Sequence, residues 1–148
     1  MLKKTVVDSS VIVKWLNTDN EQHLDQADKV LKDARDGKIE LLAPELAKYE
    51  VGNVLLFGKK LSKKQASIPL RWLFKLPIKF ISESEQSCNE TFSIAEDVKI
   101  TYYDASFIAL AKEEDAMLIT DNIKHQGKDS NIEVISLKDY AGYGRPKL

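Results

Sequence analysis

The sequence predicts an α/β fold, a three-layer α/β/α sandwich around a mostly parallel central sheet. Short β-branched or aliphatic runs alternate with longer segments whose apolar residues recur every three or four positions. Strands that alternate with helices in this way are joined by crossovers, which make neighbouring strands parallel and cover both faces of the sheet. Residues 116–120 are almost entirely apolar. Such a run is typical of a strand buried on both faces.

The length and composition indicate one globular domain. The 148 residues contain no repeat or linker, so we expect a single domain over 1–148 with a loose tail from about 141 to 148. The net charge of −1 gives no global basic field, so any nucleic-acid contact must be local. The single cysteine, Cys88, excludes an intrachain disulfide, and with two histidines it cannot complete a zinc site. No apolar run resembles a signal peptide or a membrane span, and a cytoplasmic location without membrane contact is expected.

The N-terminal third is expected to form two strands and two helices. Residues 5–7 form a β-branched run that ends in Asp8, Ser9 and Ser10, which is turn or helix-cap chemistry. Helices are then expected over 11–16 and from His23 to Gly37, followed by a strand over 39–43.

The middle of the chain is expected to be helical. Pro44 suits the first turn of a helix over 45–57, in which the spacing puts Glu50 on the apolar stripe between Leu46 and Val54. Ser62 and Gln65 have the spacing of a capping box for another helix, with Pro69 in or near its first turns. Four aromatic side chains in the first half of the chain are expected to lie in the core: Trp15, Phe57, Trp72 and Phe74.

The C-terminal half returns to alternating strands and helices. A strand is expected over 78–81, and Ser82 with Glu85 resembles a capping box for a helix towards Val98. Thr101 and Asp104 have the same spacing at the start of the next helix. Strands are expected over 116–120 and 133–135, the first of them ending in Asp121 and Asn122.

Four acids stand where a carboxylate is costly. Asp8 and Asp121 end strands of the buried type, Glu50 lies on an inward stripe, and Asp104 shares a helical face with apolar residues. Carboxylates that meet in one cleft raise one another's pKa unless a cation holds them. Oxygen ligands select Mg²⁺ or Mn²⁺ over zinc. The pattern therefore predicts an acidic metal site.

Each acid also has an ordinary structural interpretation. Asp8 could cap the following helix, and Asp104 could form a capping box with Thr101. Glu50 could reach solvent past Val54, and Asp121 could be a simple turn residue.

Four segments together resemble the PIN domain, most closely the small VapC-type toxins of bacterial and archaeal toxin–antitoxin pairs. They are residues 6–11 (VVDSSV), 43–55 (APELAKYEVGNVL), 103–111 (YDASFIALA) and 118–122 (LITDN). The resemblance implies an α/β/α sandwich and a hydrolase that cleaves RNA phosphodiester bonds with Mg²⁺ or Mn²⁺. It also implies an RNA substrate, a cognate antitoxin protein and a homodimer.

By position, the resemblance assigns Asp8, Glu50 and Asp104 to metal binding and catalysis, with Ser9 and Ser10 supporting them. The family usually has Thr, any residue, then Asp at the fourth place, where this sequence has Asn122 and an acid one position earlier, Asp121. Both are therefore assigned to the metal, and Asp121 also to catalysis. Three lysines are candidates for RNA phosphate contacts, although basic runs are usually only solvated: Lys14, Lys59 and Lys60.

The expected chemistry is attack by a metal-activated water on the scissile phosphate, with Glu50 or Asp104 orienting that water. Three alternatives stay open. One is an aspartyl-phosphate hydrolase, although Ser10 stands where a second carboxylate is expected. Another is a PIN-fold RNA- or protein-binding module with a degenerate metal site, which Asn122 favours. The third is a housekeeping RNA-processing nuclease.

Overall fold

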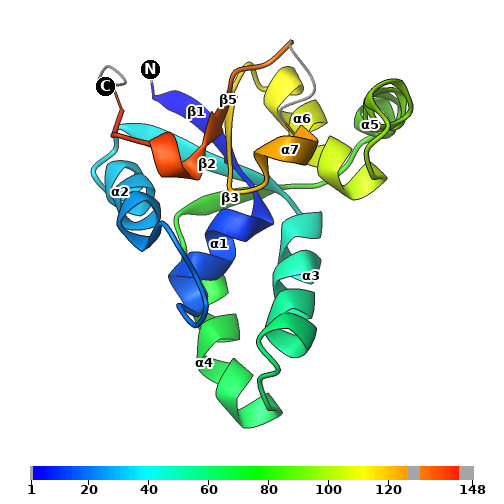
Figure 1. Ribbon diagram of the computed structural model, residues 1–148. Coiled ribbons are helices and arrows are strands. Elements are labelled where there is room, and N and C mark those ends of the chain that lie inside the picture. Colours follow the sequence, from blue (N-terminus) through cyan, green and yellow to red (C-terminus); the bar gives the residue numbers. More distant parts are fainter. Residues whose placement is uncertain (1, 127–130, 144–148) are drawn as a thin grey trace.

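The computed structural model describes residues 2–126 and 131–143, and Figure 1 shows the arrangement of its elements. Five parallel strands form one sheet in the order β3-β2-β1-β4-β5. The strands are β1 (Lys3–Val7), β2 (Ile39–Pro44), β3 (Ile78–Ile81), β4 (Met117–Thr120) and β5 (Val134–Ser136). The predicted fold class is confirmed. The expected loose tail lies mostly outside the described residues.

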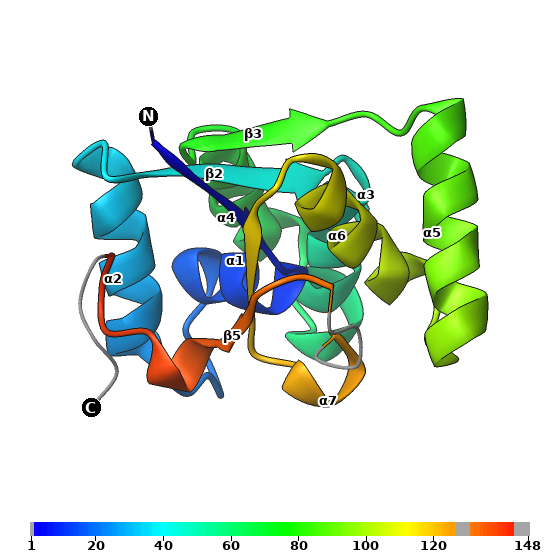
Figure 2. The same ribbon diagram turned by 90° about the horizontal axis from the view of Figure 1, so that it is seen from above.

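Helices flank the sheet on both sides, with α2 on one side and α5 and α6 on the other (Figure 2). Helix α6 packs against β1, β2 and β4, and α5 packs against α6. No helix in the described part of the chain is long and apolar enough to span a membrane. The helices are α1 (Ser9–Leu16), α2 (Leu24–Arg35), α3 (Leu46–Asn53), α4 (Lys63–Leu73), α5 (Glu85–Val98), α6 (Tyr102–Glu113), α7 (Ile123–Gln126), the π-helix η1 (Val54–Gly58) and the 3₁₀ turn η2 (Leu137–Asp139).

Strands β1 and β4 lie at the centre of the core. Val6, Val7, Leu118 and Ile119 have no exposed surface, as expected for strands covered on both faces. The strand order reverses between β1 and β4, since the chain moves outward from β1 in one direction and returns to its other side. In open α/β sheets ligands bind at such a switch point, beyond the carboxyl ends of the strands.

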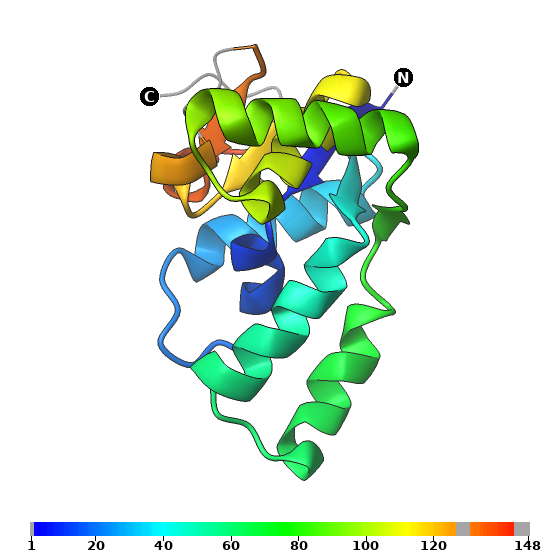
Figure 3. The same ribbon diagram turned by 90° about the vertical axis from the view of Figure 1, so that its right-hand side faces the viewer.

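Helices α3 and α4 form an arm that extends away from the sheet (Figures 1 and 3). Strand β2 runs through Pro44, which pairs with Ile81, so the prediction that Pro44 starts the helix is wrong. Proline's fixed φ suits extended backbone as well as a first helical turn. The expected helix over 45–57 is α3 continued by η1. Pro69 lies in the middle of α4, not in its first turns.

Three of the four aromatic side chains expected in the core are exposed instead. Phe57, Trp72 and Phe74 are 69%, 50% and 72% exposed, because the arm carries them beyond the layers that cover the sheet. Trp15 is partly buried against the core, and its Nε1 donates a hydrogen bond to the Ala27 carbonyl at 2.8 Å.

The predicted helix starts are confirmed at two of three places. Ser62 and Gln65 form the capping box of α4, and Thr101 caps α6 by accepting a hydrogen bond from the Asp104 N–H at 3.1 Å. The third prediction was wrong by two residues, since Ser84 and Ser87 form the capping box of α5. Ser82 and Glu85 have the same spacing as Ser84 and Ser87, but residues 82–84 are not helical and α5 begins only at Glu85.

Candidate active site

Asp8 directly follows β1 at the switch point. Its backbone N–H donates to the Ile119 carbonyl of β4 at 3.0 Å, so the sheet ladder fixes its position. Its carboxylate Oδ2 caps α1 by accepting from the Ser10 N–H at 3.4 Å, and it also accepts from the hydroxyls of Ser10 at 2.5 Å and Thr120 at 3.2 Å. The structure therefore gives Asp8 the capping role while placing it where ligands of this fold bind.

Glu50 reaches this region from the arm. The Ser9 hydroxyl donates to Glu50 Oε1 at 2.8 Å, which joins α3 to the start of α1. Burial raises the pKa of Glu50, and the carboxylates of Asp8 and Asp104 raise it further, while the hydrogen bond from Ser9 lowers it. Asp8 and Asp104, from two distant segments, therefore both lie close enough to Glu50 to act on its carboxyl group electrostatically.

Asp104 comes from the first turn of α6. There its backbone N–H is held by Thr101, and negative charge in a first turn is favoured by the helix dipole. Since the side chain also contributes to the raised pKa of Glu50, it serves the helix start and the acid cluster together. We call Asp8, Glu50 and Asp104 the acid cluster.

The raised pKa of Glu50 predicts that removing its charge stabilises the fold, by an amount that depends on pH. A folded-state pKa above the ordinary value of 4.5 gives stability that is present below that value and lost as the pH rises through the folded pKa. Glu50→Gln keeps an acceptor for Ser9. We expect it to raise the free energy of unfolding of the metal-free protein at pH 7, by about 1 kcal/mol or less because the side chain is only half-buried.

The same comparison at pH 4 should show no gain, since the wild-type carboxyl is then largely protonated. Glu96→Gln, at an exposed position of α5, is the matched control. Equal shifts for Glu50→Gln at both pH values would contradict the assignment.

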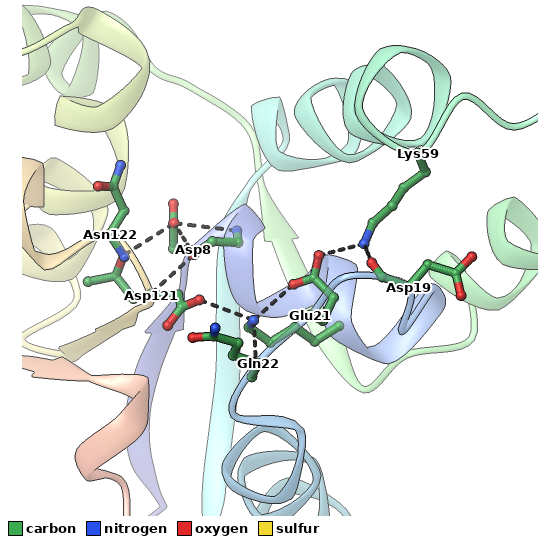
Figure 4. A network of polar contacts seen from close by, with 10 residues as sticks. Asp8, Asp19, Glu21, Gln22, Lys59, Asp121 and Asn122 are labelled. Atoms are coloured by element: carbon green, nitrogen blue, oxygen red, sulfur yellow. Dashed lines mark hydrogen bonds and ion pairs between the residues drawn. The ribbon is translucent and has the colours of Figure 1, made fainter.

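Asp121 is held by a lysine. Its carboxylate Oδ2 lies 3.1 Å from the Lys14 Nζ, and Figure 4 shows this carboxylate on the Lys14 side, below that of Asp8. Its backbone N–H donates to the Ser10 hydroxyl at 3.1 Å, and the Asn122 N–H donates to the Thr120 hydroxyl at 2.8 Å. The turn after β4 is thus tied to the same hydroxyls that bind Asp8.

Lys14 belongs to a charge network that links Asp121 to Glu21 and Lys59 (Figure 4). Its ammonium also contacts Glu21 Oε1 at 2.9 Å and the Gln22 carbonyl at 2.7 Å, while Glu21 Oε2 lies 2.6 Å from Lys59 Nζ. Lys59 in addition donates to the Asp19 carbonyl. The side chains of Lys14, Lys59 and Glu21 are only 2%, 7% and 17% exposed. We call Lys14, Glu21, Lys59 and Asp121 the ion network.

The ion network gives two of the lysines proposed for RNA another role. Lys14 and Lys59 are buried and engaged with carboxylates, so neither ammonium faces solvent for a phosphate. Lys60 remains exposed beside them. Sequence reasoning missed Glu21 and Thr120. Thr120 is fully buried at the end of an apolar strand, which is a detectable signal, whereas Glu21 lies in a polar loop with no distinguishing pattern.

The acid cluster fits a hard divalent cation by its donor chemistry. It offers carboxylate oxygens only, and a nearby cation would relieve the raised pKa of Glu50. Within residues 2–126 and 131–143, however, no three Asp, Glu, His or Cys side chains are already arranged to hold a metal ion.

The fold and the acid cluster together define a parallel α/β protein with an acidic site at its switch point. The chain belongs to the PIN domain family, whose family model matches residues 5–129. Comparison with curated proteins found no match.

Several solved structures share the fold. PAE2754 from Pyrobaculum aerophilum superposes with a TM-score of 0.67 at 23% identity over 93% of each chain. VapBC2 from Rickettsia felis, bound to a DNA fragment from its promoter, gives 0.66 at 18% identity over 90% of this chain and 98% of that one. A toxin–antitoxin complex from Klebsiella pneumoniae gives 0.66 at 16% identity over 90% and 97%.

Proposed function

We propose that the protein is a Mg²⁺- or Mn²⁺-dependent endoribonuclease, the toxin component of a VapBC-type toxin–antitoxin pair. PIN domains are generally nucleases. The observation that carries the proposal for this chain is the electrostatic coupling of Glu50 to Asp8 and Asp104 at the switch point. Three carboxylates close together do not stabilise a folded domain, whereas a site that holds a cation beside a phosphate requires them.

The residues of the chain divide the work as follows. Asp8, Glu50 and Asp104 would hold the metal, which supplies charge neutralisation at the phosphate and a more acidic water. Ser9 fixes the Glu50 carboxylate, and Ser10 and Thr120 fix that of Asp8. Glu50 or Asp104 would orient the attacking water or accept its proton. Because Asp121 pairs with Lys14, Asn122 is left as the better placed fourth ligand.

Cleavage of single-stranded RNA in Mg²⁺ or Mn²⁺ and in EDTA tests the reaction. We expect cleavage that requires the metal and leaves a 5′-phosphate and a 3′-hydroxyl. Equal rates in EDTA would refute the mechanism. Growth arrest on expression of the wild type but not of Asp8→Ala tests the role as a toxin.

The arm supports a protein partner. Several large apolar side chains on or next to the arm are exposed to water, and a partner protein would bury them. They are Leu56, Phe57, Ile68, Leu70, Trp72 and Phe74. Two of the structures that share the fold are toxin–antitoxin complexes by their names. We therefore assign the partner as a cognate antitoxin. From the resemblance to VapC-type toxins we also expect a homodimer and a cytoplasmic location.

A binding module with a degenerate site is the second candidate. Asn122 in place of an acid, and the absence of a ready metal arrangement among the described residues, favour it. Calorimetric titration with Mn²⁺ separates the two. A nuclease binds Mn²⁺ and loses it in Asp8→Asn, whereas a degenerate module binds in neither.

A further inference from the structure

A half-open cavity of about 270 Å³ lies beside the acid cluster. It is bounded by the start of α3, the end of β3, and helices α5 and α6. Buried residues of α6, including Ser106 and Leu110, line its floor, and two exposed rings, Tyr49 and Tyr103, line its walls at 77% and 58% exposure.

Two residues that line the cavity are direct sequence neighbours of the acid cluster. Tyr49 directly precedes Glu50 on α3, and Tyr103 directly precedes Asp104 on α6. Because Tyr49 and Tyr103 line the same cavity, α3 and α6 lie on two sides of it. Each helix therefore presents an acid to the cluster and, one position earlier, a tyrosine to the cavity.

We propose that this cavity is a subsite for an unpaired nucleobase of the RNA, next to the phosphate held at the acid cluster. The proposal rests on the proposed function and adds to it a place for one base of the substrate, between Tyr49 and Tyr103. Tyrosine rings stack on bases of unpaired strands, and each such base contributes about 1–3 kcal/mol. A base within a duplex is already stacked and cannot enter.

The charges around the cavity exclude a phosphate and favour certain bases. Glu45, Glu83 and Glu113 line it, with Glu45 paired to Lys48 at 3.0 Å. Glu83 accepts hydrogen bonds from the Tyr102 hydroxyl at 2.8 Å and from the Cys88 thiol at 2.7 Å. Carboxylates repel phosphate but accept from exocyclic amino groups. Adenine, cytosine and guanine carry such a group and uracil does not, so uracil is the disfavoured base.

Binding of short RNAs in EDTA, where metal-dependent cleavage is stopped, tests the subsite. The probes are labelled oligoadenylate, oligouridylate and an abasic ribose-phosphate strand of the same length, with affinity read by fluorescence anisotropy. Wild type should bind oligoadenylate at least tenfold more tightly than the abasic strand, with oligouridylate between them.

Tyr49→Ala and Tyr103→Ala should each lose about five- to fiftyfold of the affinity for oligoadenylate and almost none for the abasic strand. Replacing either tyrosine with tryptophan should retain the affinity for oligoadenylate. Phe92→Ala is the matched control, because Phe92 on α5 is 63% exposed but does not line the cavity.

Equal losses on oligoadenylate and the abasic strand, or unchanged affinity, would overturn the subsite. So would tyrosine variants that turn a dimer into a monomer in sedimentation velocity without changing RNA affinity, since the cavity would then receive a second copy. Metal-dependent cleavage without base preference refutes the subsite alone. Base-dependent binding without cleavage in Mg²⁺ refutes the nuclease alone.

Discussion

Replacing Asp8 with asparagine is expected to lower the rate of RNA cleavage by about a thousandfold while the protein stays folded. Asp8 is the acid that the sheet itself positions, since its backbone is bonded to β4 at the switch point. Removing its charge takes away one carboxylate of the proposed metal set, and an amide oxygen is a much weaker ligand for Mg²⁺. The rate is measured in single turnover with saturating protein and Mg²⁺.

Asparagine is the appropriate substitute because the capping role of Asp8 survives the change. Asn and Asp are about equally good at the N-cap, and an amide oxygen still accepts from the Ser10 N–H and from the nearby hydroxyls. The melting temperature in EDTA should therefore change little. A loss of activity with intact stability would separate the metal role from the capping role, which the sequence left as alternatives.

Asp25→Asn is the control for the charge change. Asp25 lies in the first turn of α2, is exposed, and stands outside the acid cluster and the ion network. Its replacement should leave cleavage within about twofold of wild type, as is usual for surface substitutions. If Asp8→Asn cleaves RNA as fast as Asp25→Asn, Asp8 is a cap and nothing more.

The parts of the fold that were predictable depend on local patterns. The apolar strand before Asp121 and the hydroxyl at Ser62 determine their elements through burial and capping, which are encoded within a few residues. Where a helix packs, and so which of its side chains are buried, depends on contacts that are distant in the sequence. Trp72 and Phe74 read as core residues, yet they are exposed because α4 extends beyond the sheet layers.

The same distinction applies to the site. Asp8 follows a buried strand, and strand ends meet at one edge of a parallel sheet, so its place could be predicted. Lys14 lies four residues after Ser10 on an apolar helix, where a free ammonium reaching outward was the natural interpretation. The burial of Lys14 depends on its ion pair with Glu21, which lies in a loop, and no sequence pattern predicts that pair.

Glu21→Gln is expected to lower the free energy of unfolding at pH 7 by about 3 kcal/mol, because it leaves two buried ammonium groups short of a carboxylate. Within the described residues, Lys59 would lose its charged partner and keep the neutral Asp19 carbonyl, whereas Lys14 would keep Asp121 and the Gln22 carbonyl. For a chain of this size the loss corresponds to about 6–12 °C in melting temperature. Asp36→Asn, which breaks the exposed pair with Lys32, should cost less than about 0.5 kcal/mol.

The pH dependence gives a second measurement of the same residue. Burial alone would raise the pKa of Glu21, but the hydrogen bonds and charges of Lys14 and Lys59 outweigh it and lower the pKa below 4.5. A lowered pKa stabilises the folded state above pH 4.5, and that contribution is lost as the pH falls through the folded value. The difference between wild type and Glu21→Gln should therefore shrink on acidification.

Removing the charges in pairs should restore part of the loss. In Glu21→Gln with Lys59→Met, the ammonium that lost its carboxylate at position 59 is gone and Lys14 keeps Asp121, so the double variant should be more stable than Glu21→Gln alone. Strict additivity of the two substitutions would mean that Glu21 and Lys59 do not act on each other. In that case the pair of Glu21 and Lys59 would not help to hold the end of η1 against the loop between α1 and α2.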